Sequence, residues 1–378
     1  MLSCVGRKES VLIRVLHIVP TLKRGGAEKQ LALLANGLPR DEFDVHVTTL
    51  VDDGPFARTL SQASISVTNI GQSWTIDPFA YRRLRKQIRR LQPDIVHTWL
   101  FMANCYGRKA AFRERVKHVV ASEQHVDAFR PWHQLVLDRR LAKRTNRIVT
   151  NSRCVRDCLV QNRIAADKLT VIPNGVSPAE TAKAKSRAEI LKELGLPSDA
   201  RLIASIGRLT PHKRLKDLIW ATDLLSCVRD DAHLLIIGEG PHRARLERFR
   251  AQCHVTDQVH FLGHRDDVQQ LLPHLDCVWI ASSLEGQSNV IMEAMSAKVP
   301  VIASDIAANR ELVVPNETGY LVRVGDRAAF ARWTNYLLDN GRTAKSMGEK
   351  GQRRMQAEFS QERMVQRHVD LYNELAQM

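Results

Sequence analysis

Two glutamates eight positions apart, Glu285 and Glu293, are the residues of this 378-residue chain best placed to do chemistry. Glu285 follows an apolar run at 277–280 and a short turn, and a helical run from about residue 289 carries Glu293. Ligands of parallel α/β sheets bind outside the carboxyl ends of strands, where helix N-termini offer free N–H groups to anions. The carboxylates would flank such groups, and a nucleotide sugar, with hydroxyls on both sides of a diphosphate, suits this arrangement. The amides concerned are those of Gly286, Gln287, Ser288 and Asn289.

Two basic residues could neutralise that diphosphate. Arg208 and Lys213 come directly after another apolar run, at 202–206. Arginine offers a fork of donors to phosphate oxygens, and lysine offers a mobile point charge. Fixed cations of this kind stabilise the charge that builds on a departing diphosphate when no metal does so. The alternative interpretation is that both are surface cations of a basic protein.

A pair of glycines closes the first apolar run of the chain. Gly25 and Gly26 have no side chain, so the backbone there can approach a diphosphate closely or adopt a positive φ. A Gly-Gly turn alone is weak evidence, because many loops contain one. The dinucleotide fingerprint GxGxxG is absent from the sequence, which argues against a dehydrogenase.

Apolar and helical runs alternate along both halves, which predicts an α/β protein with two doubly wound, mostly parallel sheets. The expected strands are 11–19, 45–50, 65–70, 94–97, 118–122, 147–150, 202–206, 234–237, 259–262, 277–280 and 301–303. The expected helices are 27–37, 78–91, one between 122 and 147, one from about 215, one after 241, 266–273 and one from about 289, with only helices after 326. Residues 172–176 form a turn by their chemistry, and 177–200 is polar. We therefore expect an N-terminal domain at 1–176 and a second domain at 177–360.

Composition restricts the class of protein. Hydrophobic residues make up 44% and charged residues 26%, which is typical of a soluble globular protein. No window of about 18 apolar residues occurs, so we expect no membrane-spanning helix. Arg14 interrupts the N-terminal apolar run, which favours a buried first strand over a signal peptide. The seven cysteines are scattered without a CxxC pair, so we expect thiols in a reducing compartment and no metal site.

The net charge of +15 lies almost entirely in the first half of the chain. Residues 1–175 contain 29 Lys and Arg against 15 Asp and Glu, whereas the remainder contains 27 against 26. Two segments, 82–90 and 139–144, dominate the excess and have apolar residues at helical spacing. They could be solvated faces, a docking surface for an anionic membrane leaflet, or a nucleic-acid site. No nucleic-acid-binding motif accompanies the charge.

Several motifs in order resemble the retaining family 4 glycosyltransferases (glycosyl transferases group 1). Glu285 and Glu293 match the E-x7-E signature of that family, and the likeness extends from about residue 15 to 338. The resemblance implies the GT-B fold, with two Rossmann-like domains facing across a cleft, the first on the acceptor side and the second binding the nucleotide sugar. A last helix, 361–378, would return to the N-terminal domain. The other motifs are Gly-Gly-Ala-Glu at 25–28, Pro-Asn-Gly-Val at 173–176, Gly-Arg-Leu at 207–209, Lys213 and Gly-Glu-Gly-Pro at 238–241.

The resemblance also implies roles for individual residues. Arg208 and Lys213 would contact the diphosphate, Glu285 the hydroxyls of the transferred sugar, and Glu293 the ribose hydroxyls. Glu293 could instead stabilise its helix N-terminus, by less than about 1 kcal/mol. The remaining binding residues would approach the diphosphate, the phosphates or the base. They are Gly25 and Gly26 with Arg24, Gly238 and Gly240, and Leu262, Gly263 and His264.

Two positions depart from the family pattern. Arg214 follows Lys213 where the family has glycine, which could alter the local turn. Lys298 replaces the glycine of A-x-G-x-P, so that a helix C-terminus loses an easy left-handed residue. We expect Lys298 to lie behind the site and activity to survive.

Two histidines are candidates on the acceptor side. His97 ends an expected strand, and His125 lies in Ser-Glu-Gln-His at 122–125, where the resemblance places a histidine near the acceptor or the reacting sugar. The alternative for each is a histidine satisfied within the core. Neither is predicted to be the general base, because retaining members of the family are thought to use a donor phosphate oxygen to take the acceptor proton.

The leading hypothesis is a metal-independent, retaining glycosyltransferase without a cofactor. It would move a hexose or N-acetylhexosamine from a nucleoside diphosphate, expected to be UDP, to a saccharide or lipid-linked acceptor in envelope or exopolysaccharide synthesis. We expect a cytoplasmic protein, with the basic half at the inner face of the membrane as one option and no nucleic-acid partner. The alternatives are a nucleotide-sugar epimerase of the GT-B fold and a non-catalytic nucleotide- or nucleic-acid-binding protein.

Overall fold

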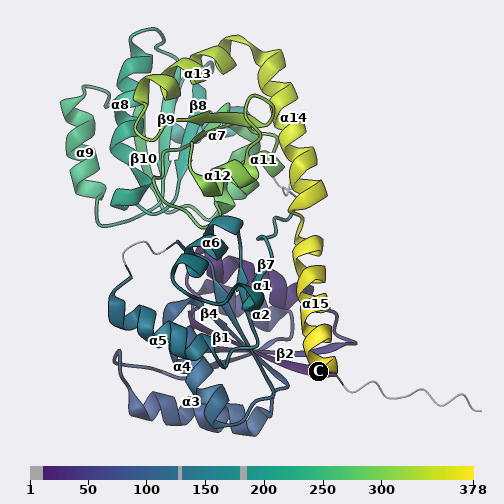
Figure 1. The fold of residues 1–378 in the computed structure, drawn as a ribbon. Helices are drawn as coiled ribbons and strands as arrows, with labels where there is room; N and C mark the ends of the chain where they lie inside the picture. The colour runs from purple at the N-terminus through teal and green to yellow at the C-terminus, as the bar shows by residue number, and fades with distance from the viewer. Residues whose placement is uncertain (1–11, 127–129, 179–184) are drawn as a thin grey trace, which may run out of the picture. The chain divides into compact units, whose positions relative to one another are not determined.

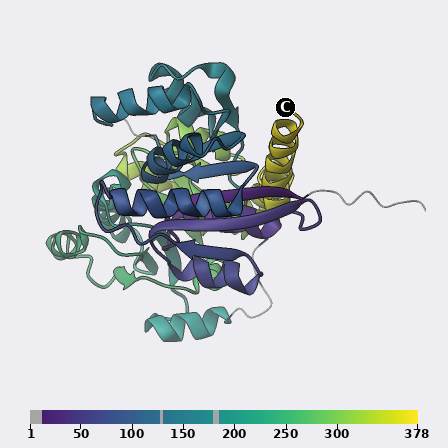
Figure 2. The same cartoon turned by 90° about the horizontal axis from the view of Figure 1, so that it is seen from below.

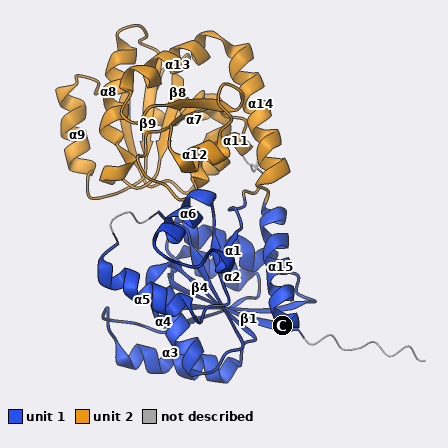
Figure 3. Cartoon of the chain, viewed as in Figure 1, with its two compact units in different colours: residues 1–175, 361–378 blue, residues 176–360 orange. Residues whose placement is uncertain are grey.

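The structure, a computed structural model, describes residues 12–126, 130–178 and 185–378, and the chain divides into two compact units (Figure 3). Unit 1 comprises Met1–Gly175 and Gln361–Met378, and unit 2 comprises Val176–Ser360. These limits lie beside the boundaries expected after residues 176 and 360. The first strand was expected at 11–19. Residue 11 lies outside the described residues, and the observed strand begins at Ile13.

Unit 1 is built on a seven-stranded parallel sheet of order β3-β2-β1-β4-β5-β6-β7 (Figure 1). Its strands are β1 (Ile13–Thr21), β2 (Phe43–Asp52), β3 (Ser66–Asn69), β4 (Ile95–Trp99), β5 (His118–Glu123), β6 (Arg147–Thr150) and β7 (Leu169–Val171). Its helices are α1 (Gly26–Gly37), α2 (Pro55–Gln62), α3 (Pro78–Leu91), α4 (Leu100–Arg113), α5 (Trp132–Ala142), α6 (Arg153–Gln161), the 3₁₀ turn η1 (Ala166–Lys168) and α15 (Gln361–Gln377).

Apolar residues cover both faces of this sheet. On β1, Val15 and Val19 pack with α1 and α15, whereas Leu16 and Ile18 pack with α3 and α4. A strand buried on both faces is apolar throughout rather than alternating, which explains the uniform runs of the sequence. The yellow helix α15 packs beside α1 (Figures 1 and 2), so the end of the chain completes the core of unit 1.

Unit 2 is built on a six-stranded parallel sheet of order β10-β9-β8-β11-β12-β13. Its strands are β8 (Arg201–Ile206), β9 (Ala232–Ile237), β10 (Val259–Gly263), β11 (Cys277–Ile280), β12 (Val301–Ser304) and β13 (Gly319–Val322). Its helices are α7 (Arg187–Leu194), η2 (Pro211–Lys213), α8 (Leu215–Ser226), α9 (Arg243–Gln252), α10 (Val268–Leu271), η3 (Leu272–His274), α11 (Asn289–Ser296), α12 (Ala307–Leu312), α13 (Arg327–Asp339) and α14 (Gly341–Glu358).

The polar segment 177–200 is not a linker throughout. Ser186 begins α7 with a capping box, in which its side chain accepts from the Glu189 amide and the Glu189 carboxylate accepts from the Ser186 amide. Gly195 ends the helix in the left-handed conformation, with φ 66°. Ile190 and Leu191 anchor α7 to the core of unit 2, so the expected boundary region contributes to that unit.

A cluster of buried histidines joins α15 to the sheet of unit 1. His97 is hydrogen-bonded through Nδ1 to the Tyr372 hydroxyl (2.6 Å) and through Nε2 to the Ser122 hydroxyl (2.8 Å). His17 on β1 accepts from Trp99 Nε1 (3.1 Å). His97 is therefore satisfied within the core, the second of its two interpretations, rather than a residue of the acceptor side. The reason is that β4 is covered on both faces.

Burial also controls the protonation of this cluster. It lowers the pKa of His17 to about 3 and that of His368 on α15 to about 4, and it lowers the pKa of His97 well below its usual value of 6.5. The electrostatic effect of His368 lowers the pKa of His17 further. All three imidazoles are therefore neutral in the folded protein at neutral pH.

Unit 1 should lose stability as the pH falls from 6.5 towards 4. In this window the unfolded chain takes up protons at the three histidines and the folded unit does not, so the free energy of unfolding falls. The expected loss is about 1.4 kcal/mol per pH unit for each histidine. Urea unfolding across this pH range measures it. The variant His368→Leu should show a shallower decline, and equal slopes for variant and wild type would contradict the assignment.

Candidate active site

The strand order of unit 2 creates a crevice at one edge of its sheet. The chain runs from β8 through α8 to β9 on one side, while β11 pairs with β8 on the other. Ligands of open α/β sheets bind at such a switch point, outside the carboxyl ends of the strands. A recess opens there between the ends of β8 and β11. It is lined by Ser205, Ile206, Gly207, Arg208, Lys213, Leu215, Ile280, Ala281 and Ser282.

The loops that follow β8 and β11 meet in an ion pair at this crevice. Lys213 Nζ lies 2.5 Å from Glu285 Oε1, with 21% and 13% of the two side chains exposed. The Ser283 amide also donates to the His212 carbonyl at 2.8 Å. Arg208 is exposed; its backbone carbonyl accepts from the Thr210 amide at 2.9 Å, and its guanidinium makes no hydrogen bond or ion pair within the described part of the chain. The structure thus brings Lys213 and Glu285 together and places Arg208 at the mouth of the recess.

Close backbone packing holds the loop after β8 in place. The Gly207 φ is 144°, and a Cβ added to Gly238 would lie 2.0 Å from the Gly207 carbonyl oxygen. A Cβ added to Gly240 would lie 2.6 Å from the Leu209 carbonyl oxygen. Only glycine fits these contacts. Gly238 and Gly240 therefore support the loop that carries Arg208.

The end of β10 and the residue that follows it contain the three residues expected near the base, and each has a different environment. Gly263 adopts a left-handed conformation with φ 67°, and its carbonyl accepts from the Gly238 amide at 2.7 Å. The Leu262 side chain packs against the core, and His264 is exposed and contacts Asp266 at 3.1 Å. Contact with a base would therefore involve the backbone of this segment more than the Leu262 side chain.

The start of α11 provides the expected amides. Gly286, Gln287 and Ser288 are buried, and Ser288 caps the helix by accepting from the Ile291 amide at 3.4 Å. Asn289 is the first helical residue, and the half-buried Glu293 is the fifth. Glu293 therefore lies just beyond the first turn, on the same helix as the amides that follow Glu285.

Both departures from the family pattern keep the glycine-like backbone. Arg214 has φ 53° and Lys298 has φ 63°, in the left-handed region that costs other residues about 1–2 kcal/mol. Arg214 therefore preserves the turn after Lys213, and its Nε donates to Asp217 at 2.6 Å. Lys298 is exposed and follows the C-terminus of α11, whereas the expected amides lie at the N-terminus of that helix.

In unit 1, β1 and β4 border the corresponding switch point. Gly25 precedes α1 as its N-cap with an extended φ of −151°, and Gly26 begins the helix. Gly25 therefore needs no positive φ, and the atom nearest to an added Cβ, Glu28 Oε2 at 2.1 Å, is the end of a flexible side chain that can move away. Arg24 beside it is exposed. His125 is also exposed, two residues beyond β5, unlike the buried His97.

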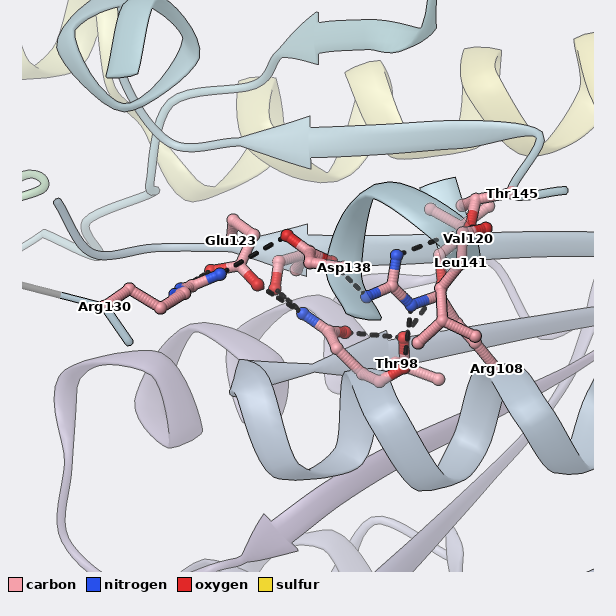
Figure 4. Close-up of polar contacts among 10 residues, drawn as sticks. Thr98, Arg108, Val120, Glu123, Arg130, Asp138, Leu141 and Thr145 are labelled. Atoms are coloured by element: carbon pink, nitrogen blue, oxygen red, sulfur yellow. Dashed lines mark hydrogen bonds and ion pairs between the residues drawn. The ribbon is translucent and has the colours of Figure 1, made fainter. Parts of the chain in front are cut away.

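The sequence analysis missed a buried polar network at the end of β5. Asp138 on α5 lies between the guanidinium groups of Arg108 and Arg130 (Figure 4). Arg130 also donates to Glu123 at 3.1 Å, and Glu123 accepts from Asn104 at 2.8 Å. These residues tie α4, β5 and α5 together. Asp138, an isolated acid in a basic segment, is the sequence signal that could have indicated the network.

Two family models match the chain in succession. The model described as Glycosyltransferase Family 4 matches residues 24–180, and the model described as Glycosyl transferases group 1 matches residues 186–354. The second match contains Arg208, Lys213, Glu285 and Glu293.

Curated relatives and a solved structure extend this similarity. The chain is 28% identical over 188 residues to N-acetyl-alpha-D-glucosaminyl L-malate synthase of Bacillus anthracis, covering 50% of this chain and 49% of that protein. This match and two others span about half the length of those relatives. The chain is 25% identical over 318 residues to UDP-Gal:alpha-D-GlcNAc-diphosphoundecaprenol alpha-1,3-galactosyltransferase of Escherichia coli, covering 78% and 79%. The crystal structure of Anabaena Alr3699/HepE in complex with UDP and glucose has a TM-score of 0.85 at 22% identity, covering 96% and 100%, a likeness of fold.

Breaking the buried network should destabilise unit 1. Arg108→Met leaves the Asp138 carboxylate without its buried partner on α4, so the free energy of unfolding should fall by about 3–5 kcal/mol. Chemical denaturation measures this loss. Arg113→Met, at an exposed position on the same helix, is the matched control and should change stability little. Equal stabilities of the two variants would contradict a structural role for the network.

Proposed function

The chain belongs to family 4 of the glycosyltransferases, with two parallel α/β sheets as in the GT-B fold, and we propose that it transfers a sugar from a nucleoside diphosphate. The donor is a UDP-hexose or UDP-N-acetylhexosamine, and the acceptor is a saccharide or lipid-linked molecule of cell-envelope or exopolysaccharide synthesis. The observation that carries this proposal is the Lys213–Glu285 pair at the switch point of unit 2.

The names of the relatives support the donor and acceptor classes. The Anabaena protein binds UDP and glucose in its crystal structure, and the Escherichia coli relative is named for a UDP-Gal donor and a diphosphoundecaprenol acceptor. The Bacillus anthracis relative is named for an N-acetylglucosaminyl product. UDP and a lipid-linked acceptor are therefore the favoured choices for this chain.

Binding of the donor exchanges partners at the ion pair. The diphosphate takes Lys213 from Glu285 and also meets Arg208 and the amides at the start of α11. Glu285, released from the ammonium group, accepts hydrogen bonds from hydroxyls of the sugar. Glu293 accepts hydrogen bonds from the ribose hydroxyls. The cations then stabilise the charge that develops as the diphosphate departs, without a metal.

The proposed transfer retains the anomeric configuration. The bond between the anomeric carbon and the phosphate oxygen breaks, and the acceptor oxygen bonds to the same face of that carbon. The acceptor proton passes to a phosphate oxygen of the departing nucleoside diphosphate. The proposed contribution of His125, Gly25 and Gly26 is to hold the acceptor and the sugar diphosphate from unit 1.

Substitution of the ion pair should separate the roles of its two members. Lys213→Ala should lower kcat/KM about 10²–10³-fold and weaken UDP binding, because the diphosphate loses a fixed cation. Glu285→Gln should lose turnover and still bind UDP at least as well as wild type, because UDP has no sugar and Lys213 is no longer neutralised. Calorimetry and a transfer assay measure both effects.

The exposed Lys345→Ala on α14 removes the same charge away from the crevice and is the control for this pair. A panel of UDP-, GDP- and ADP-sugars, with products detected by mass spectrometry, supplies the assay. Full turnover by Lys213→Ala or Glu285→Gln would contradict the proposed site. An epimerised donor without acceptor would favour an epimerase, and RNA binding without sugar-nucleotide binding would favour a non-catalytic protein.

An exposed patch in unit 1 supports docking of the protein on an anionic membrane. Trp74, Ile76 and Phe79, just before and within the start of α3, are 66%, 85% and 59% exposed. Aromatic and aliphatic side chains beside basic residues are typical of interfacial membrane sites. No helix of the described residues combines the length and apolar character needed to span a membrane.

Only part of the basic charge of α3 is available to lipid. Arg85 and Arg89 pair with Glu114, whereas Arg82, Lys86 and Arg90 are exposed. In the second basic segment, Arg139 donates to the Asn162 carbonyl, whereas Arg140, Lys143 and Arg144 are exposed, the last with its guanidinium over the Phe112 ring. The exposed cations of α3, Arg82, Lys86 and Arg90, together with the exposed apolar residues at its start, therefore define the proposed docking patch.

Binding to phosphatidylglycerol vesicles should depend on both parts of this patch. Lys86→Gln should weaken it by about 1 kcal/mol, or roughly fivefold, and Ile76→Ser should weaken it further through lost apolar contact. Added salt should weaken it as well. Val228→Ser, at a position in unit 2 that is 70% exposed, is the control. Binding that does not respond to lipid charge would contradict the docking proposal.

A further inference from the structure

A second cavity of unit 2 lies between α8 and α9 and has a volume of about 400 Å³. It shares only Leu215 with the lining of the crevice that contains Arg208 and Lys213. The Leu209 amide donates to the Glu239 carbonyl (3.0 Å), and the His242 amide donates to the Leu209 carbonyl (3.2 Å). The loops after β8 and β9 are thereby joined beside this cavity. Its volume lies within the range of small-molecule sites.

The cavity is strongly cationic. Its lining includes four basic side chains and one carboxylate, Asp217. Asp217 accepts from Arg214 (2.6 Å) and from Arg327 (2.9 Å), so one negative charge is shared by two guanidinium groups. The other two cations, Lys216 and Arg245, have no carboxylate partner among the described residues. The excess of three positive charges favours an anionic ligand.

The backbone adds to this positive potential. The first turns of α8 and α9, which start at Leu215 and Arg243, both contribute lining residues. The unpaired amides at helix N-termini favour anions, and phosphate in particular. Two helix N-termini and four basic side chains around one cavity thus give a positive potential that suits an anion.

Aromatic rings hold two of the cations in position. The Arg327 guanidinium lies 4.3 Å from the centre of the Trp220 ring, and Lys216 Nζ lies 4.7 Å from that of Phe249. Stacked in this way, the cations lose less conformational freedom when a ligand binds. Arg245 is exposed at the rim and is free to close on an anion.

Arg214 departs from the family pattern, which has glycine at the position after Lys213. Its left-handed backbone, with φ 53°, suits glycine, yet an arginine occupies the position and directs its guanidinium to Asp217 at the cavity. The strain of this conformation is tolerated, and the cavity gains a cation that glycine would not supply.

We infer that the cavity between α8 and α9 is a second anion-binding site, for a ligand that bears a phosphate ester. The phosphate is held by Arg214, Lys216, Arg245 and Arg327, and the helix N-termini complete its surroundings. The same chemistry is found in a free phosphomonoester and in a phospholipid headgroup. This inference does not depend on the proposed sugar transfer, because its test measures binding alone.

The test is calorimetric titration of the full chain with glycerol 3-phosphate in the presence of saturating UDP. UDP occupies the crevice, so the expected result is one further binding event. Arg245→Gln should weaken it about tenfold, since an exposed charge-assisted contact to phosphate is lost without disturbing the core. Arg248→Gln removes the same charge from an exposed position of α9 that does not line the cavity and should leave binding unchanged.

A second variant checks the role of the left-handed arginine. Arg214→Gly restores the residue suited to that backbone and removes the guanidinium, so the protein should fold and bind glycerol 3-phosphate several-fold more weakly. Thermal unfolding without ligand confirms the folding of this variant. Unchanged affinity in both Arg214→Gly and Arg245→Gln would overturn the inference.

Vesicle binding distinguishes the two sources of the phosphate. If Arg245→Gln weakens binding to phosphatidylglycerol vesicles as much as binding to glycerol 3-phosphate, the ligand is a lipid headgroup. If only the binding of glycerol 3-phosphate changes, the ligand is a free phosphomonoester. The inference is overturned if the UDP-saturated protein binds no glycerol 3-phosphate, if Arg248→Gln weakens binding equally, or if Lys213→Ala rather than Arg245→Gln abolishes it.

Discussion

The ion pair between Lys213 and Glu285 is the interaction on which the proposed site depends. It joins two loops that leave neighbouring parallel strands, β8 and β11, at the place where the order of the described strands of unit 2 reverses. Each member neutralises the other in the structure. In the proposed function, a diphosphate replaces the carboxylate as the partner of the lysine. The strand order, the packing of both faces of the sheet and the capped start of α11 all serve to hold these two charges at one crevice.

Close packing at the strand ends fixes the loops that carry the proposed site. Gly238 and Gly240 allow the neighbouring loops of unit 2 to touch, and a side chain at either position would collide with backbone. In unit 1, polar contacts hold neighbouring elements together. They are the Arg108–Asp138–Arg130 contacts and those of the buried histidines. The buried charges of the Arg108–Asp138–Arg130 contacts need their partners in place, because an unpaired charge is costly in the interior.

Features that depend on local sequence patterns, such as the bounds of several helices and strands, could be predicted from the sequence. Features that depend on contacts between residues far apart in the chain could not. The bounds of α3, β6 and β11 follow from their apolar spacing, and Lys213 and Glu285 were recognised from their motifs before the structure joined them. The helix α7 was overlooked although Ser186 and Glu189 form a capping box, because the segment is polar. The burial of His97 and the pairing of Arg108 with Asp138 depend on residues far away in the chain, so spacing could not reveal them. The roles of His125, Gly25 and Gly26 stay predictions.

Hydrogen–deuterium exchange of the protein with and without a UDP-hexose tests the central claim most directly. A diphosphate held by the ion-pair residues and the start of α11 should slow exchange in two segments that are distant in the sequence, 207–213 and 285–293, while the exposed end of α14 stays unchanged. Protection confined to other segments, or none at saturating donor, would contradict the account.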